Sequence, residues 1–262
     1  MIDFVPIRDG RRALSLAVFI VGAGVALSAA AQMVGAPPAS RPTGYLAAGQ
    51  LPDSLLVVPP PPAAGSAQDR ADHEAFDASR ALEGSPRWRQ ARADVELFGP
   101  LAHRSFACAI GKSITPQATP TLSRLLDRVV IDAGRSTAAA KDHYNRVRPA
   151  VGNDKPICVA REDWLKTNGS YPSGHAAAGW AWGLVLAEIA PEKTSAVTLR
   201  AREFGDSRFV CGVHFPTDVE AGRTMGAATV ARLHADAAFV ADLAAAKAEL
   251  AKAPAPTDCA AP

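Results

Sequence analysis

The sequence predicts an all-α protein, built as a helical bundle. Of its 262 residues, 48% are hydrophobic but only 6% are aromatic. Alanine is very frequent, which suits helices packed through small side chains better than a strand-rich sandwich. No stretch alternates apolar and polar residues over a useful length, so an all-β fold is disfavoured. The length allows one full core, which favours a single domain with appendages.

The first element, residues 1–31, is predicted to be a signal peptide. Arg8, Arg11 and Arg12 precede an uncharged run from Ala13 to Ala31 that ends in small residues, the pattern that a signal peptidase accepts. The alternative is an uncleaved membrane anchor, because the run approaches the length of a spanning helix. Its Ala/Gly-rich second half is weakly apolar and favours cleavage. We therefore expect an exported protein with no stable membrane association after cleavage.

Residues 32–68 are predicted to form a proline-rich N-terminal arm. Pro59 to Pro62 are four consecutive prolines, which favour an extended polyproline conformation over a packed element. Arms of this kind often lie on a neighbouring molecule. The helical domain is expected over residues 69–252, followed by a C-terminal tail over 253–262.

Helix-start signals recur along residues 69–252. Ser85-Pro86 supplies an N-cap followed by proline at the first helical position, and Gly99 is expected to end that helix. Thr119-Pro120 repeats the signal ahead of apolar residues at helical spacing. Three more helices are expected at 137–146, at 173–189 and from Pro216 toward Lys252, with Gly222 and Gly226 as candidate break points in the last.

Charge and cysteine content exclude several classes of function. The 28 Lys and Arg residues against 26 Asp and Glu leave a net charge of +2, so nothing points to a nucleic-acid partner. An even number of cysteines in an exported chain favours two disulfides, with three pairings open. The cysteines lack CxxC spacing, which argues against zinc and redox roles. They are Cys108, Cys158, Cys211 and Cys259, and a bridge to the last would tether the tail.

The first polar cluster is Lys141, six residues, then Arg148-Pro149. Seven residues are close to two helical turns, so both cations are expected on one side, while Pro149 disfavours helix through Arg148. An ammonium and a planar guanidinium can hold different oxygens of a phosphate group. The alternative is a solvated basic face.

The second cluster is Pro172-Ser173-Gly174-His175, directly before an apolar run. Ser173 can cap the helix that follows, and Gly174 allows close approach of the backbone. The free N–H groups and the helix dipole form an anion site beside which His175 would stand. The alternative is a structural histidine at a helix start.

The third cluster is Ser207-Arg208, five residues, His214, three residues, Asp218. At this spacing the Asp218 carboxylate can accept a ring N–H of His214, fix its tautomer and leave the other nitrogen free to attack. Arg208 adds a third cation. The alternatives are a surface Asp–His pair and a shared metal ion. No further carboxylates or histidines cluster with them, so no metal is expected.

Together these segments resemble the three-part signature of the type 2 phosphatidic acid phosphatase (PAP2) superfamily, with eleven of eleven fixed positions filled in order. The class A bacterial non-specific acid phosphatases are the most similar members. They share the Leu51 to Pro62 arm, Ala140 before Lys141, Gly169-Ser170-Tyr171 and Cys211-Gly212-Val213. The similarity spans residues 45–223. One departure is Ala150, where a larger apolar residue is expected.

The resemblance implies a helical bundle of the PAP2/vanadium haloperoxidase type and a periplasmic, homo-oligomeric acid phosphatase without metal or cofactor. It would hydrolyse a broad range of phosphate monoesters through a phosphohistidine, with phosphotransfer as a side activity. His214 would attack phosphorus, Asp218 would orient it, and His175 would protonate the leaving group and then activate water. The implied phosphate-binding residues are Lys141, Arg148, Ser173, Gly174 and Arg208.

Three rival functions remain open from the sequence. Vanadate mimics the phosphoryl transition state, so a vanadium-dependent haloperoxidase would use the same pocket, although those chains are generally longer. Lipid-phosphate phosphatases share the signature but usually have several membrane spans. A non-catalytic phosphate-binding module is the third. Gly111-Lys112-Ser113 is not a P-loop, because Phe106 stands where its first glycine is needed.

Overall fold

The computed structural model describes residues 42–257 and 259, so the predicted signal peptide and the start of the predicted arm lie outside the described residues. Every regular element within that part of the chain is helical, which confirms the predicted all-α class. No helix in it combines the length and apolarity needed to cross a bilayer. The α-helices are α1 (Ser54–Val57), α2 (Ala67–Ser79), α3 (Pro86–Ala93), α4 (Gly99–Ile110), α5 (Pro120–Ser136), α6 (Ala138–Tyr144), α7 (Trp164–Thr167), α8 (Gly174–Ile189), α9 (Thr194–Val210), α10 (Pro216–Leu233) and α11 (Ala237–Lys252).

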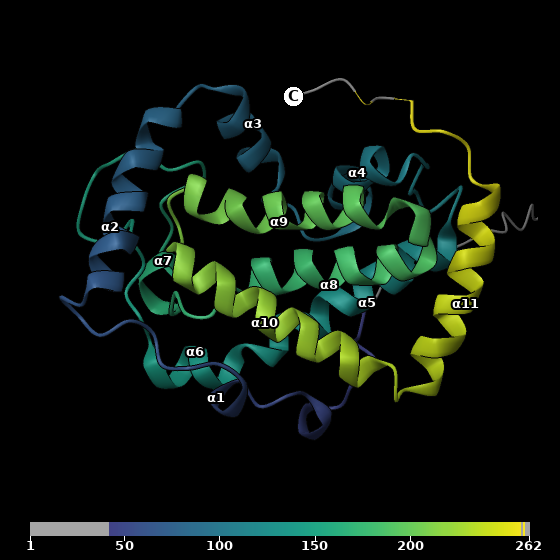
Figure 1. Cartoon of the computed structure of the whole chain (residues 1–262), viewed down its shortest axis with the longest axis horizontal. Helices are drawn as coiled ribbons and strands as arrows, with labels where there is room; N and C mark the ends of the chain where they lie inside the picture. Colours follow the sequence, from purple (N-terminus) through teal and green to yellow (C-terminus); the bar gives the residue numbers. More distant parts are fainter. Residues whose placement is uncertain (1–41, 258, 260–262) are drawn as a thin grey trace, which may run out of the picture. The chain divides into compact units, whose positions relative to one another are not determined.

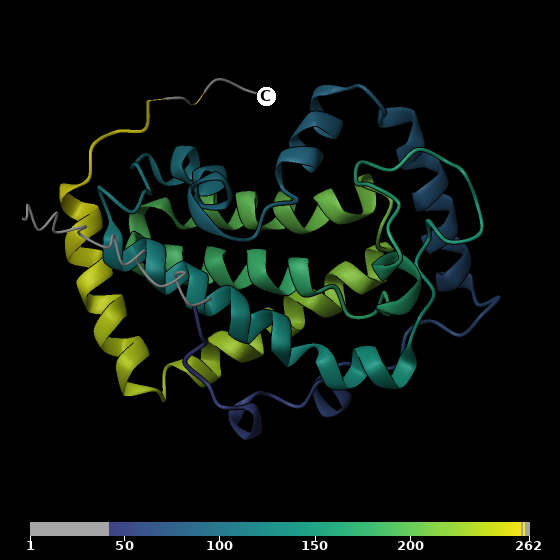
Figure 2. The ribbon, with the colours of Figure 1, turned by 180° about the vertical axis from the view of Figure 1, so that it is seen from behind.

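Helix α8 is the centre of the bundle. It lies between α9 and α10, with α5 packed against it from behind (Figures 1 and 2). Trp182 of α8 is fully buried and donates from its indole nitrogen to the Leu126 carbonyl of α5 at 2.9 Å. Gly183 of α8 lets α9 approach, since a Cβ there would stand 2.4 Å from the Ala201 Cβ. Small side chains therefore allow the close packing that the composition predicted.

Helix α10 crosses α8 at two glycines. A Cβ at Gly222 would lie 2.3 Å from the Ser173 carbonyl oxygen, and one at Gly226 would lie 2.4 Å from that of Ala177. The prediction that these glycines break the helix is therefore wrong, because they serve contact between helices. The chain turns instead before α11, whose N-cap Asp236 accepts from the Phe239 N–H at 2.9 Å.

Several helices, α4 and α9 among them, lie where the sequence predicted none. Helix α3 begins after Ser85 as expected but ends at Ala93, and Gly99 is the first residue of α4 rather than the end of α3. Gly99 has φ +73°, a left-handed conformation that favours glycine. Helix α9, which carries Ser207 and Arg208, was also not predicted.

The described part of the arm packs on its own chain. The buried Asp132 carboxylate of α5 accepts from the Tyr45 and Leu46 N–H groups at 2.7 and 3.3 Å. Further along, Ser54 accepts from the Ala140 N–H at 2.9 Å, and the Tyr171 hydroxyl donates to the Pro59 carbonyl at 2.6 Å. These contacts bring the arm against α5, α6 and the segment that precedes α8.

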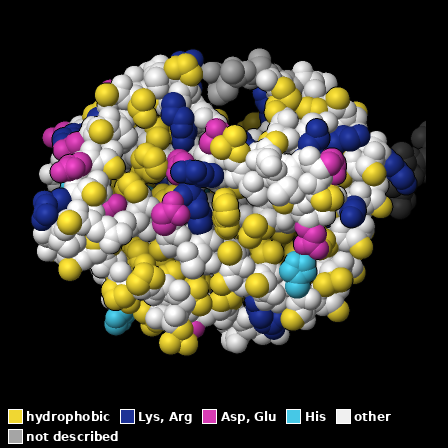
Figure 3. Space-filling model, in the orientation of Figure 1, with side chains coloured by type: hydrophobic (Ala, Val, Ile, Leu, Met, Phe, Trp, Pro, Cys, Tyr) yellow, Lys and Arg dark blue, Asp and Glu magenta, His cyan; other side chains and the backbone are white. Residues whose placement is uncertain are grey.

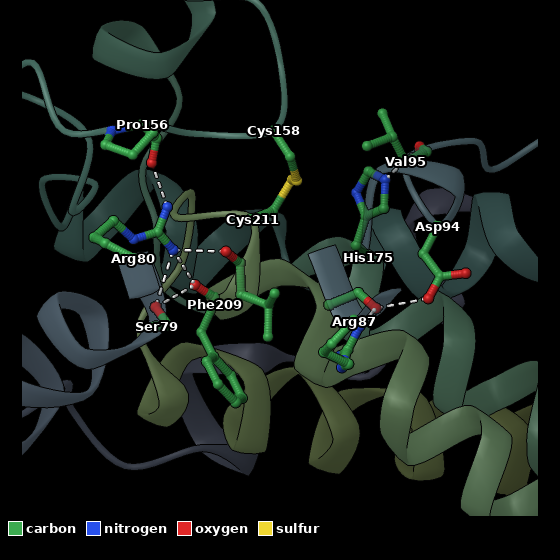
Figure 4. The surroundings of a disulfide bond; sticks show 12 residues. Ser79, Arg80, Arg87, Asp94, Val95, Pro156, Cys158, His175, Phe209 and Cys211 are labelled. Atoms are coloured by element: carbon green, nitrogen blue, oxygen red, sulfur yellow. Dashed lines mark hydrogen bonds between the residues drawn. A yellow bond between two sulfur atoms is a disulfide. The ribbon is translucent and has the colours of Figure 1, made fainter. Parts of the chain in front are cut away.

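The disulfides select one of the three open pairings, Cys108 with Cys259 and Cys158 with Cys211. The first ties the tail to α4, as predicted for Cys259. The second joins the loop before α7 to the end of α9 (Figure 4). Beside it, Arg80 donates to the Phe209 and Val210 carbonyls at 3.0 and 2.6 Å.

The surface carries mixed charges on the face that Figure 3 shows. Dark blue and magenta side chains are interspersed there with apolar ones, without a broad area of one sign. For example, Arg223 of α10 pairs with Asp206 of α9 at 2.6 Å and with Glu220 on its own helix. This mixture agrees with the near-neutral net charge of +2.

Candidate active site

A pocket of about 380 Å³ lies at the N-terminal end of α8. It brings together residues of all three predicted clusters. Ser173 and Asp218 of the predicted set do not line it and are fully buried beside it. The predicted residues that line it are Lys141, Arg148, Gly174, His175, Arg208 and His214.

The start of α8 follows the sequence prediction. Ser173 is the N-cap, and its hydroxyl accepts from the Ala176 N–H at 3.3 Å. The Ser173 N–H donates to the Asp218 carbonyl at 2.9 Å, which ties α8 to α10. Gly174 and His175 form the first turn at the pocket, where free N–H groups and the helix dipole favour an anion.

Lys141 lies on α6 and is held by backbone. Its Nζ donates to the Gly169 and Pro172 carbonyls at 2.7 and 2.9 Å. Burial, together with the positive charge of Arg148, lowers the pKa of Lys141 to about 7. Gly169 is needed for this approach, since a Cβ there would lie 2.8 Å from the Lys141 carbonyl oxygen.

Arg148 reaches the pocket from the loop after α6 rather than from a helix. The helix ends at Tyr144, and Asn145 follows in the left-handed region with φ 38°. The Arg148 guanidinium donates to the Asn168 carbonyl and to its side-chain oxygen at 2.9 and 3.0 Å, and it stacks on Trp164 at 4.9 Å. Burial lowers the pKa of Arg148 to about 10, so it stays charged.

His214 has both ring nitrogens engaged. Nε2 lies 2.9 Å from Arg148 Nη1, which only donates, so Nε2 is the acceptor and Nδ1 carries the hydrogen. Nδ1 lies 3.3 Å from the Ser170 hydroxyl and 3.6 Å from Asp218 Oδ2. Ser170 donates in turn to Asp218 Oδ2 at 2.5 Å. Burial, then Arg148 and Lys141, hold the pKa of His214 well below its usual range.

The role of Asp218 thus differs in detail from the sequence expectation. At 3.6 Å its carboxylate is too far for a direct hydrogen bond to His214. The Ser170 hydroxyl bridges the two side chains, accepting from His214 and donating to Asp218. In the sequence, Ser170 was part of the resemblance to the family, but no role was predicted for it.

Arg146 is a second residue that sequence reasoning missed. Its Nη1 donates to Asp218 Oδ1 at 2.7 Å and its Nη2 to Asp72 Oδ2 of α2 at 2.9 Å. The guanidinium also lies over the Phe215 ring at 4.3 Å. The Asp218 carboxylate is therefore bound on one oxygen by Arg146 and on the other by Ser170. The sequence offered one signal for this role, since Arg146 is a second arginine near Arg148. It falls in the six-residue spacer, where the family signature fixes no residue type.

Arg208, in the last turn of α9, is nearly inaccessible to solvent. Within the described part of the chain, its Nε and Nη1 atoms have no hydrogen-bond partner. Burial, together with the charge of Arg148, lowers its pKa to about 10. Leaving charged donors buried and unbonded is costly, so this side chain is suited to bind an anion in the pocket.

His175 is anchored by backbone. Its Nε2 lies 2.9 Å from the Val95 carbonyl oxygen, toward which the ring points in Figure 4. A carbonyl only accepts, so Nε2 carries the hydrogen and Nδ1 is the free nitrogen. Burial, then Arg208, hold the pKa of His175 well below its usual range.

The remaining walls of the pocket are largely apolar or neutral. Ala150, the departure from the family pattern, is buried but does not line the pocket. In residues 42–257 and 259, no three His, Cys, Asp or Glu side chains gather as a metal site would require. The other lining residues are Leu97, Val130, Gly134, Thr137, Trp164 and Asn168.

Comparison with known proteins gives consistent relatives. Residues 125–239 match the PAP2 superfamily. An acid phosphatase of Zymomonas mobilis is 38% identical over 77% of this chain and 76% of its own length. A non-specific acid phosphatase of Providencia stuartii is 39% identical over 90% and 97%. A non-specific acid phosphatase of Salmonella typhimurium is 41% identical over 69% and 73%.

Proposed function

Since this chain belongs to the PAP2 superfamily and is an acid phosphatase by its relatives, we propose that it hydrolyses phosphate monoesters through a phosphohistidine. We propose further that it accepts a broad range of monoesters, needs no metal or cofactor, and transfers phosphate to alcohols as a side activity. The 38–41% identity to proteins named acid phosphatases favours hydrolysis over the halide oxidation and the simple binding considered above.

The observation that carries the proposal is the charge of the pocket. Lys141, Arg148 and Arg208 converge on it, and none of its lining residues is a carboxylate. Three buried cations without a lining counterion repel one another, and a bound anion offsets that cost. A phosphoryl group carries three oxygens outside the line of attack, which matches three cations together with the first N–H groups of α8.

In the first step, the Arg148 guanidinium turns from His214 Nε2 to a phosphoryl oxygen and frees the lone pair of that nitrogen. Nε2 then attacks phosphorus, and the bond from phosphorus to the ester oxygen breaks. The Nδ1 hydrogen stays on the imidazolium, where Ser170 and Asp218 stabilise the new positive charge. His175 gives a proton to the departing oxygen. A bound phosphate anion raises the pKa of His175 and so opposes the lowering by burial and Arg208. His175 therefore becomes protonated when substrate enters the pocket.

In the second step, water attacks the phosphohistidine. His175, now neutral, takes one proton from that water, and the bond between phosphorus and His214 Nε2 breaks. Inorganic phosphate leaves, and both histidines return to their starting protonation. An alcohol in place of water would give the transferred ester.

The segments outside the pocket complete the proposal. Residues 1–31 direct export to the periplasm and are removed, 32–68 form the arm, 69–252 the catalytic domain and 253–262 the tail. Two disulfides suit an oxidising compartment. The mature enzyme is proposed to be a homo-oligomer without stable membrane association.

The test compares His214→Ala with His175→Ala on an aryl phosphate in the presence of chelator. His214→Ala should abolish turnover and the acid-labile phosphoenzyme trapped by rapid quench. His175→Ala should still form the phosphoenzyme from substrates with good leaving groups, because these need no acid. His143→Ala is the matched control, since His143 is exposed and lies outside the pocket.

Three results would count against the proposal. Formation of phosphoenzyme by His214→Ala would show that His214 is not the nucleophile. Activity lost in chelator and restored by zinc or magnesium would reverse the metal prediction. Bromide oxidation with vanadate and peroxide, in a protein that cleaves no phosphate ester, would point to haloperoxidase chemistry.

A further inference from the structure

We propose that Asp94 and Ser207 are positioning residues for His175, acting through the Val95 carbonyl. This inference rests on the proposed function, in which His175 is the acid and base. Ser207 is a fixed position of the family signature, yet it is fully buried and does not line the pocket. Its hydroxyl therefore acts on the chemistry through another group.

Asp94 is that group. It follows α3 as its C-cap and is 1% exposed, so its carboxylate needs partners. Oδ2 accepts from the Ser207 hydroxyl at 2.6 Å, and Oδ1 accepts from Arg200; both donors are on α9. Arg87 of α3 donates to the same Ser207 hydroxyl at 2.9 Å. These bonds clamp the end of α3 against the helix that carries Arg208.

The clamp fixes the direction of the next carbonyl. Val95 follows Asp94 directly, and its carbonyl oxygen accepts from His175 Nε2 at 2.9 Å. Figure 4 shows Asp94, Val95 and His175 together, with the imidazole directed at the Val95 backbone. A loop that shifted at Asp94 would carry this acceptor away from the ring.

The anchor matters because His175 must present one nitrogen to the ester oxygen. With Nε2–H bound to Val95, Nδ1 is the nitrogen left for the pocket. When His175 is protonated, the Nε2–H to carbonyl bond becomes charge-assisted and stronger, which favours the acid form. Losing the anchor therefore misdirects the ring and lowers the fraction of His175 that can donate.

The experiment measures kcat/KM for phosphate esters that range from dinitrophenyl to simple alkyl leaving groups. Asp94→Asn and Ser207→Ala should lower kcat/KM for alkyl phosphates by about 10- to 100-fold, within the range that general acids contribute. For the dinitrophenyl ester, which needs no acid, the loss should stay below about threefold. His175→Ala gives the reference for how steeply kcat/KM depends on the leaving group when the acid is absent.

Gln90→Ala is the matched control. The side chain of Gln90 also joins α3 to α9, donating to Glu203 Oε2 at 3.2 Å. The Gln90 carbonyl accepts from the Asp94 N–H at 3.0 Å, a backbone bond that the substitution keeps. Gln90→Ala should leave the dependence of kcat/KM on the leaving group unchanged.

A second readout is the tautomer of His175, measured by ¹⁵N NMR. It should be Nε2–H in the wild type and mixed in Ser207→Ala.

The outcomes separate the two levels of inference. If Ser207→Ala and Asp94→Asn lose activity equally on all esters, or Ser207→Ala keeps a pure Nε2–H tautomer, the positioning role is overturned while the proposed mechanism stands. If His175→Ala loses no more kcat/KM on alkyl phosphates than on the dinitrophenyl ester, the positioning role and the proposed role of His175 as acid are both overturned. Should Asp94→Asn fail to fold, Ser207→Ala decides alone, because it removes only one hydroxyl.

Discussion

Arg146 donates from Nη1 to Asp218 Oδ1 at 2.7 Å, on the side of the carboxylate opposite to Ser170. The same guanidinium binds Asp72 of α2 at 2.9 Å, so one arginine connects two buried carboxylates from distant helices. It fixes Asp218 and balances its charge, which sets how strongly the carboxylate acts on His214 through Ser170.

Replacing Arg146 by Gln should therefore lower kcat with little change in KM. Arg146 does not line the phosphate pocket, but a small displacement of Asp218 misaligns His214, and misplacement of about 1 Å costs on the order of 100-fold. Steady-state kinetics at constant pH tests this, and Arg146→Lys should recover part of kcat. A raised KM with unchanged kcat would contradict it.

The pH profile should report Lys141. Because its pKa is lowered to about 7, it is charged below that pH and neutral above it. Phosphate binding needs the charge, so kcat/KM for a dinitrophenyl ester, which needs no proton from His175, should fall as pH rises through about 7. In Lys141→Arg the falling limb should move to higher pH, because a guanidinium keeps its proton. If the falling limb stays at the same pH in Lys141→Arg, the titrating group is not Lys141.

Gly222→Ala should both destabilise the protein and impair the site. The new Cβ would start 2.3 Å from the Ser173 carbonyl oxygen, so α8 and α10 must separate at the point where the pocket is built. Overpacking of this kind costs about 1–3 kcal/mol. Thermal unfolding and kcat/KM measure the two effects. Gly49→Ala is the control, since nothing lies within 4 Å of a Cβ there.

Asp132→Ala should release the arm from α5. The variant loses the acceptor of the Tyr45 and Leu46 N–H groups, and leaving buried donors unbonded costs about 1–3 kcal/mol. Limited proteolysis should cut the variant near residues 42–53 faster than the wild type. Activity should largely persist, since Ser54 still binds the Ala140 N–H beside Lys141. Equal cleavage rates would show that other contacts hold the arm.

Short-range chemistry predicted much of the candidate site. The N-cap at Ser173 depends on a bond three residues ahead, and the pairing of His214 with Asp218 on a spacing of four, so both can be inferred from a short stretch of sequence. Arg146 could not be found in this way, because its partner Asp72 lies 74 positions away. Ser170, between His214 and Asp218, likewise acquires its role only when the loop before α8 meets α10.

The fold shows the same division. Helices with a local start signal were predicted to begin close to where they do, as at Pro120 for α5, and for α8 the predicted end at Ile189 also agrees. Helix α9 was missed because it is packed against α3, α4, α8 and α10, so its buried residues do not form one stripe. Gly222 and Gly226 were misinterpreted because intrinsic propensity disfavours glycine in a helix, whereas the crossing with α8 requires it.

The two disulfides make nested rings of the covalent chain. Cys108 and Cys259 close the larger ring, with a sequence separation of 151, and Cys158 and Cys211 close a smaller one within it, with a separation of 53. Every predicted site residue, from Lys141 to Asp218, belongs to the larger ring. A single backbone cut in any exposed loop between Cys108 and Cys259 therefore opens a circle without releasing a fragment. The cations and histidines of the pocket remain parts of one covalent molecule after the first nick by a protease.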